Sequence, residues 1–385
     1  MPTNATGLPA DAAASPRASG QGRNVGIDLL RVVAMFYVLI LHTLGQGGVL
    51  NAAAEGSAQY HLAWFLEIGA YGAVDIFALI SGYVSYSARE KKVHFARYVV
   101  LWLQVVFDGL IVTLAYRLLR PELVTGRDFL SALLPVTQGS YWFFSAYTGL
   151  FFLMPLLNAG VRKCPDALLR KVFVGLILVF SVYGRMVDHF GLNGGYSVLW
   201  IAILYLLGAI IKKCELGSRF RLWQVFLAIL LCHLAGWAWH AYGVEFTAFG
   251  VVVPRMAFVS YLSPTVVIGS VCYVIGFAKL RFHPGLKKAV SFAAAGAFSV
   301  YILNCQRFIY GTELANRFAY LGTASPAVIL THVVGFCLAF LAAALLLDGV
   351  RRWLFRALRV TELADRLVAA VDRLLSAVTG ARGNG

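Results

Sequence analysis

Charged residues are scarce in this sequence of 385 residues. They make up 13% of the chain, whereas a soluble domain usually carries about 25%. Hydrophobic residues account for 60% of the sequence, and apolar stretches of about 20 residues recur along most of it. So little charge and so much apolar surface exclude an ordinary soluble domain and are typical of an integral membrane protein.

Several motifs of soluble enzymes are missing. No Rossmann or P-loop glycine pattern is present. The six cysteines are scattered without a CxxC pair, so we expect them to pack in apolar segments and not to form disulfides or bind a metal. The net charge of +15 could indicate a nucleic-acid partner, but the basic residues lie between the apolar stretches. That placement is the positive-inside pattern of membrane proteins, and we therefore expect a lipid bilayer, not nucleic acid, as the partner.

The apolar segments predict an all-α, polytopic membrane fold with about ten transmembrane helices. Basic loops alternate with loops poor in Lys and Arg, which places both termini in the cytoplasm. Loops 88–97, 162–171, 212–221 and 279–290 each carry four Lys or Arg residues. The ten predicted segments are 27–48, 63–87, 97–118, 141–161, 167–184, 196–212, 221–240, 259–279, 291–310 and 326–348.

Three regions follow from this pattern. Residues 1–24 are rich in Ala, Gly, Ser and Pro, and we expect a disordered cytoplasmic tail. Residues 25–348 form the membrane domain. Residues 349–385 predict an amphipathic cytoplasmic helix followed by a short tail. This helix could lie on the inner membrane surface or stay in the cytosol without lipid contact. Its apolar positions at helical spacing are Leu363, Leu367, Val371 and Leu374.

The first segment carries Arg31 and His42, although a charge at the centre of a transmembrane helix costs about 2.5–3.5 kcal/mol. His42 lies eleven positions after Arg31, which puts the two on one helix face with His42 roughly 16 Å deeper. This face predicts a polar path inside the bundle. A guanidinium suits phosphate binding, and an imidazole can take a proton from a hydroxyl. Two alternatives remain open: Arg31 snorkels to the interface, and His42 makes a structural hydrogen bond.

The pattern says less about the role of other notable residues in the apolar segments. Asp75 could pair with His42 and raise its basicity, or it could serve packing or helix capping. Gly82 would let two helices approach closely. His233 and His240 share one helix face, but further metal ligands are lacking, so we expect structural or interfacial roles and no metal site.

Five stretches, in order, resemble the acyltransferase-3 family of membrane acyltransferases, in particular its branch of surface-polysaccharide O-acetyltransferases. The stretches are IDLLRVVAMFYVLILH (27–42), VDIFALISGYV (74–84), YWFFSAYTGLFFLMPLLN (141–158), GGYSVLWIAILYLLGAIIKK (194–213) and AFSVYILN (297–304).

The resemblance implies a multi-pass protein of the bacterial inner membrane. Such a protein moves an acyl group, commonly acetyl from acetyl-CoA, to a hydroxyl of a glycan or lipid-linked saccharide beyond the membrane. His42 then takes the catalytic role, with Asp75 as its partner, and Arg31 and Arg97 contact the acyl-CoA donor. Ser81, Trp142 and Asn158 match motif positions of the family, and we expect these three and Asn304 to contact the substrate.

Two positions depart from the family pattern. Asn304 stands where the late span usually ends in His, and an amide cannot act as a base near neutral pH. Arg97 stands alone where the third span usually begins with several arginines. The general-base role therefore rests on His42. A non-enzymatic flippase or exporter of a lipid-linked glycan is the alternative function, because it too needs many spans and buried charge.

Overall fold

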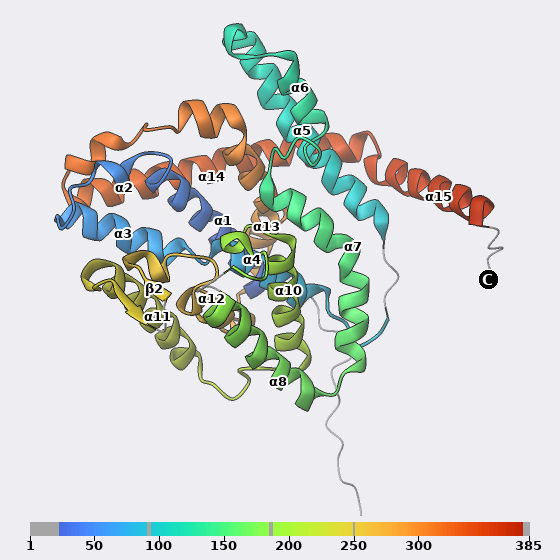
Figure 1. Cartoon of the computed structure of the whole chain (residues 1–385). Helices are drawn as coiled ribbons and strands as arrows, with labels where there is room; N and C mark the ends of the chain where they lie inside the picture. Colours follow the sequence, from blue (N-terminus) through green and yellow to red (C-terminus); the bar gives the residue numbers. More distant parts are fainter. Residues whose placement is uncertain (1–22, 91–93, 185–187, 249–250, 380–385) are drawn as a thin grey trace, which may run out of the picture.

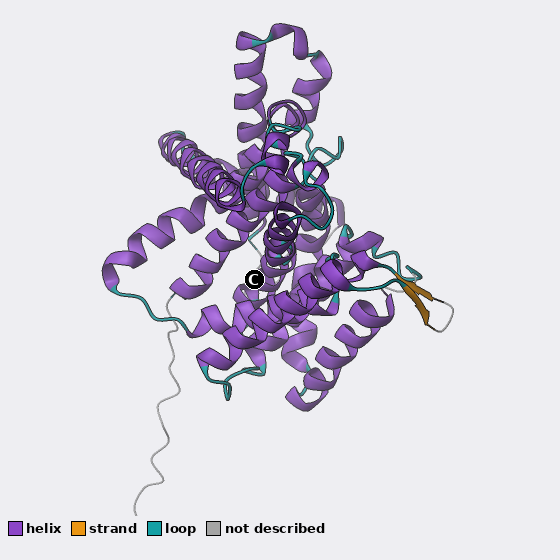
Figure 2. Cartoon of the chain, turned by 90° about the vertical axis from the view of Figure 1, so that its left-hand side faces the viewer, coloured by secondary structure: helices purple, strands orange, loops and turns teal. Residues whose placement is uncertain are grey.

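The computed structural model describes residues 23–90, 94–184, 188–248 and 251–379, and helices dominate this part of the chain (Figures 1 and 2). The predicted disorder of residues 1–24 falls almost wholly outside the described residues. A two-stranded antiparallel hairpin lies at the edge of the helical body and pairs β1 (Phe246–Ala248) with β2 (Val251–Val253).

The helices differ widely in length. In chain order they are α1 (Val25–Leu44), α2 (Val49–Ala52), α3 (Ala58–Ala70), α4 (Ala73–Ser85), α5 (Phe95–Leu119), α6 (Gly126–Leu133), α7 (Trp142–Lys163), α8 (Asp166–Leu176) with a π-helical continuation (Ile177–Tyr183), α10 (Val198–Lys213), α11 (Leu222–Tyr242), α12 (Pro264–Lys279), α13 (Pro284–Cys305), α14 (Pro326–Ala357) and α15 (Val360–Thr379).

All ten predicted segments are helical, which confirms the all-α class. Within the described ranges, seven helical segments are long and apolar enough to cross a membrane, so the count of ten is not confirmed. The predicted segments 167–184, 196–212 and 259–279 form α8, α10 and α12, of 11, 16 and 16 residues. The predicted segment 63–87 is also broken, because α3 ends at Ala70 and α4 begins at Ala73.

Local sequence explains where several helices begin. The Asn24 side chain accepts hydrogen bonds from the backbone N–H groups of Gly26 and Ile27, which satisfies two free donors at the start of α1. Helices α12, α13 and α14 each begin with proline, a residue that lacks an N–H and has a dihedral angle suited to the first helical position. These starts fix the register of α1 and α13, which carry the site described below.

Close helix contacts hold α1 and α4 inside the bundle. Helix α1 packs against α3, α4, α12, α13 and α14. Helix α4 packs against α10 through two glycines: a Cβ atom on Gly82 would lie 1.8 Å from the Tyr205 carbonyl oxygen, and one on Gly208 would lie 2.0 Å from that of Leu79. The predicted close approach at Gly82 is confirmed, and neither position has room for a side chain.

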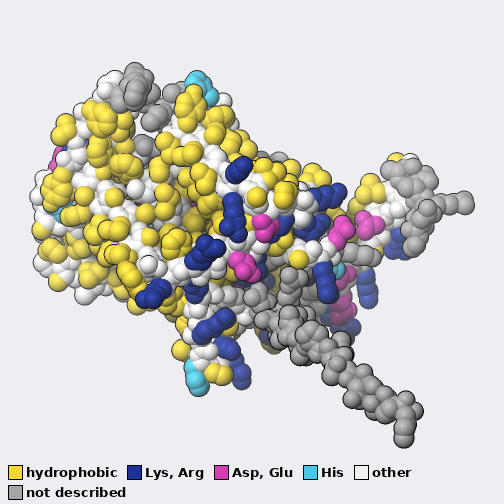
Figure 3. Space-filling view, turned by 90° about the horizontal axis from the view of Figure 1, so that it is seen from below, with side chains coloured by type: hydrophobic (Ala, Val, Ile, Leu, Met, Phe, Trp, Pro, Cys, Tyr) yellow, Lys and Arg dark blue, Asp and Glu magenta, His cyan; other side chains and the backbone are white. Residues whose placement is uncertain are grey.

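Two parts of the chain extend away from this body: α5 with α6 on one side and α15 on another (Figure 1). Helix α14 continues through residue 348 to Ala357, beyond the end expected for the last apolar segment. The predicted amphipathic helix corresponds to α15, and its apolar positions Leu363 and Leu367 are 56% and 55% exposed. Lipid contact of this face stays a prediction. On the face drawn in Figure 3, Lys and Arg side chains gather at one end of a broad apolar surface.

Candidate active site

A basic cavity of about 860 Å³, here called the vestibule, lies between the segment before α5, the first half of α5 and the second half of α7. Arg89, Arg97 and Arg162 line it, with Glu90 as the acidic residue among its lining. Asn158 lies on the same wall. The predicted donor residue Arg97 and the predicted substrate residue Asn158 therefore share one positively charged cavity.

A second cavity of about 270 Å³, the Arg31 chamber, adjoins the vestibule because Leu101 and Tyr147 line both. Arg31 and Ser81 line this chamber. Arg31 therefore lines a cavity, and its side chain is 26% exposed. The Ser81 hydroxyl donates to the Phe77 carbonyl oxygen of its own helix, at 2.9 Å.

The charge of Arg31 is partly balanced. Its Nη1 atom lies 2.8 Å from Oδ1 of Asp28, one turn earlier on α1. The same carboxylate also pairs with Arg23, and Asp28 itself is buried. Two arginines therefore share one carboxylate, which holds the Arg31 guanidinium in place and leaves the group with a net positive charge beside the chamber.

A third cavity, the His42 chamber, follows the second. It is small, at about 30 Å³, and shares Phe77 and Phe143 with the Arg31 chamber. His42 and Trp142 line it, together with Tyr261 and Tyr301. The vestibule, the Arg31 chamber and the His42 chamber thus lie one after another, and each neighbouring pair shares two lining residues.

Asn304 determines which ring nitrogen of His42 carries the hydrogen. Its side-chain oxygen Oδ1 bonds with Nδ1 of His42. An amide oxygen only accepts, so Nδ1 carries the hydrogen and the lone pair of the neutral ring lies on Nε2. Tyr310 packs edge-on against the ring, with the centroids 4.9 Å apart. The late-span asparagine therefore orients the histidine, a role that does not require it to be a base.

The predicted pair of Asp75 with His42 is wrong in this structure. Asp75 is fully buried, and its Oδ1 atom accepts a hydrogen bond from Nε1 of Trp200 on α10, at 3.2 Å. The position of Asp75 in the first turn of α4 directs it to α10, while Asn304 on α13 occupies Nδ1 of His42.

The two histidines of α11 make structural contacts. Nε2 of His233 lies 2.8 Å from the Phe65 carbonyl oxygen, and Nε2 of His240 lies 3.1 Å from the Tyr60 hydroxyl. Both contacts tie α11 to α3. Among the described residues, no group of three or more His, Cys, Asp or Glu side chains could hold a metal ion.

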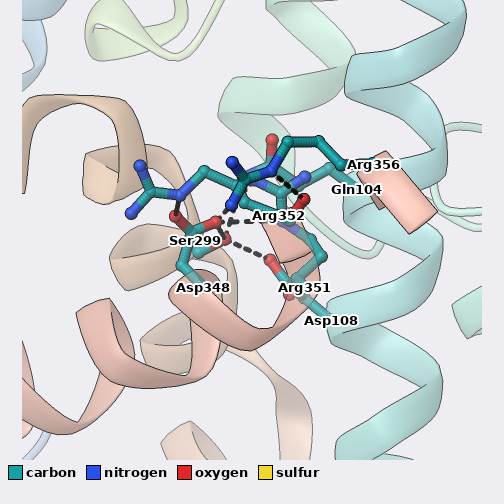
Figure 4. Close-up of polar contacts among 7 residues, drawn as sticks. All are labelled: Gln104, Asp108, Ser299, Asp348, Arg351, Arg352 and Arg356. Carbon is teal, nitrogen blue, oxygen red and sulfur yellow. Dashed lines mark hydrogen bonds and ion pairs between the residues drawn. The ribbon is translucent and has the colours of Figure 1, made fainter. Parts of the chain in front are cut away.

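The sequence interpretation missed a buried polar cluster (Figure 4). Asp348 lies 2.6 Å from Nη2 of Arg351 and 2.7 Å from Nε of Arg352. The Ser299 hydroxyl lies 2.7 Å from Oδ2 of Asp108 and 3.0 Å from Oδ1 of Asp348, and can donate to one of them at a time. The cluster joins α5, α13 and α14. One signal was available in the sequence: Asp348 precedes Arg351 and Arg352 by three and four positions, the spacing of ion pairs on a helix.

The cluster is relevant to the site because α13 contributes residues to both of them. Ser299 binds the cluster, while the neighbouring Ala297 and Phe298 line the Arg31 chamber. Asn304, further along the same helix, holds His42. Anchoring α13 to α5 and α14 therefore positions both the chamber wall and the partner of His42.

The sequence model of the acyltransferase-3 family, described as an acyltransferase domain, matches residues 24–348. The matched range includes Arg31, His42, Arg97 and Asn304. With its apolar helices, this match defines a multi-pass membrane protein of the acyltransferase class. The chain belongs to the acyltransferase-3 family. No curated protein and no solved structure matches it significantly.

Proposed function

We propose that this protein transfers an acyl group, most simply acetyl, from acyl-CoA to a hydroxyl of a cell-surface glycan or lipid-linked saccharide. One observation carries the proposal: Arg31 and His42 line two adjoining cavities, and the first of these adjoins a basic vestibule. A phosphorylated donor can bind at one end of this series while a hydroxyl reacts at the other.

The vestibule suits the nucleotide part of coenzyme A. Three arginines against one glutamate attract phosphates, and Arg guanidinium groups bind phosphate through paired hydrogen bonds. The narrower Arg31 chamber, lined largely by Ala and aromatic side chains, suits the slender arm that carries the thioester. Arg31, held by Asp28, guides this arm toward His42.

His42 acts as the general base. Its Nε2 atom takes the proton of the acceptor hydroxyl while the hydroxyl oxygen bonds to the acyl carbon. The carbon–sulfur bond of the thioester breaks, and the coenzyme A thiolate leaves and receives a proton. Asn304 keeps the hydrogen on Nδ1 so that Nε2 stays available, and its own Nδ2 is buried without a partner among the described residues, free for a substrate oxygen.

We assign the protein to the bacterial inner membrane, with the vestibule and both termini on the cytoplasmic side, where acyl-CoA is made. A flippase or exporter is not favoured, because the family match indicates acyl transfer. A carrier would also need neither a donor cavity nor an oriented imidazole.

Replacing Arg31 by glutamine should raise KM for acetyl-CoA about tenfold, because a charge-assisted contact is lost. Initial rates of label transfer from radiolabelled acetyl-CoA to alkali-treated surface glycan measure this effect in purified protein. Mild alkali removes the natural esters and exposes the acceptor hydroxyls.

The matched control is Arg366→Gln, which removes an exposed arginine of α15 and should leave KM unchanged. Wild-type protein that moves no label from acetyl-CoA to any glycan fraction contradicts the proposed function. An unchanged KM in Arg31→Gln removes Arg31 from the donor site and returns it to an interfacial role.

A further inference from the structure

A fourth cavity, here called the polar pocket, lies where α6 meets the starts of α7 and of the segment after α13. Its volume is about 150 Å³. Most of its lining side chains are polar: Asp128, Ser131, Gln138, Ser140, Gln306 and Arg307. Nothing in the proposed donor path uses this pocket.

Fixed contacts build its walls. Asp128 accepts hydrogen bonds from the Thr125 backbone and hydroxyl at 2.8 Å, and its other oxygen lies 2.9 Å from Nη1 of Arg307. The Gln306 side-chain oxygen accepts from the Phe308 backbone N–H at 2.7 Å. These contacts join α6 to the segment after α13, so the pocket is formed without a ligand.

Several groups of the lining remain free to bind. The structure gives no side-chain hydrogen bond, within its described residues, for Ser131, Gln138 or the hydroxyl of Tyr141. The amide nitrogen of Gln306 is free in the same sense. Gly109 packs closely here, since a Cβ atom on it would lie 3.3 Å from that of Ala132 and 3.7 Å from the Tyr141 hydroxyl. Hydroxyl and amide groups of this kind both donate and accept hydrogen bonds.

The charges of the pocket exclude an anionic ligand as its natural occupant. Asp128 and Arg307 neutralise each other within the wall. The free groups are all uncharged. A neutral, hydroxyl-rich ligand matches them, whereas a phosphate or carboxylate would find no unpaired cation. The vestibule, with its excess of arginines, has the opposite character.

The position of the pocket continues the cavity series along three helices. Along α5, Arg97 faces the vestibule, Leu101 both the vestibule and the Arg31 chamber, and Gly109 the polar pocket, with Gly109 about 18 Å from Arg97 along the helix. On α7 the same order runs backwards from Arg162 to Tyr141, which directly precedes the His42-chamber residue Trp142.

The third helix gives the same order. On α13, Phe298 faces the Arg31 chamber and Tyr301 the His42 chamber, and Gln306 follows in the polar pocket. The rings of Tyr141 and Tyr301 lie 6.3 Å apart, so two tyrosines separate the polar pocket from the His42 chamber.

We infer that the polar pocket binds a sugar unit of the acceptor, adjacent to the unit that receives the acyl group at His42. This inference rests on the proposed function and adds the place at which the saccharide is held. The acceptor would then approach from the end of the bundle opposite to the vestibule.

The test combines Gln138→Leu with Tyr141→Phe, which remove free polar groups and keep the size of the side chains. We expect KM for alkali-treated surface glycan to rise about threefold to tenfold, as the loss of one or two neutral hydrogen bonds implies. KM for acetyl-CoA should not change. Thr137→Val, at an exposed neighbouring position outside the lining, is the matched control and should change neither constant. Two acceptor preparations, water-soluble glycan and solvent-extracted lipid-linked saccharide, show which form the pocket serves.

The outcomes separate the two claims. Normal glycan KM in the double variant with both acceptors, with transfer still dependent on His42, overturns the sugar site and leaves the acyltransferase intact. Absence of transfer by the wild-type protein overturns the proposed function itself. A higher KM for acetyl-CoA in the double variant would also overturn the sugar site, because it would place these residues on the donor path.

Discussion

Replacing His42 by alanine should lower kcat for acyl transfer by roughly 10²–10⁴-fold, the usual contribution of general acid–base catalysis. The ring lines a cavity that continues the donor path, and Asn304 leaves its Nε2 lone pair free. In the His42→Ala variant no imidazole remains at this position, and water must deprotonate the acceptor hydroxyl. Initial rates at saturating acetyl-CoA measure the loss.

The control is His332→Ala. His332 is exposed on α14, its Nδ1 atom lies 2.9 Å from the Val328 carbonyl oxygen of the same helix, and its ring packs edge-on against Tyr320. This variant should keep the wild-type rate. A His42→Ala protein that folds and transfers at the wild-type rate would leave the imidazole with the structural role considered at the outset.

Replacing Asp348 by alanine should lower the free energy of unfolding by about 3–5 kcal/mol, because it leaves buried arginine without its partner. Asp348 is fully buried, and Arg351 is 5% exposed. Oδ1 of Asp348 accepts from Nε and Nη2 of Arg351 at 2.9 and 2.6 Å (Figure 4). Denaturant unfolding of the purified protein, followed by tryptophan fluorescence, measures the change.

Asp365→Ala provides a matched control, since it removes an exposed carboxylate of α15 and should cost little. The paired replacement Asp348→Leu with Arg351→Met should cost less than Asp348→Ala alone, because only the less buried Arg352 then loses its partner. If the single and paired variants unfold at the same denaturant concentration as the wild type, the cluster does not anchor α13.

The helical segments and the shared face of Arg31 and His42 could be predicted from the sequence because both depend on local pattern. Apolar runs located the helices, and the eleven-residue spacing of Arg31 and His42 placed them on one face of α1. The cavities along this face agree with that reading. Gly82 was likewise readable, since a small residue in an apolar segment signals close packing.

Contacts between distant segments were not accessible. The sequence suggested Asp75 as a partner for His42 because both are polar residues in successive predicted segments. In the structure, the orientation of α4 directs Asp75 to Trp200. Ser299 and Asp108 belong to helices nearly two hundred positions apart, and no local pattern joins them. The break between Ala70 and Ala73 also escaped notice, because apolar residues continue across it.

The central claim is that one series of cavities joins a donor site on the basic side to an acceptor on the other. It is tested most directly in sealed vesicles whose protein molecules all expose their C-termini outside. Radiolabelled acetyl-CoA is added outside, and alkali-treated glycan is enclosed. The account predicts label on the enclosed glycan, and none when the His42→Ala protein is used. Label that reaches glycan only when both substrates are on the same side would contradict it.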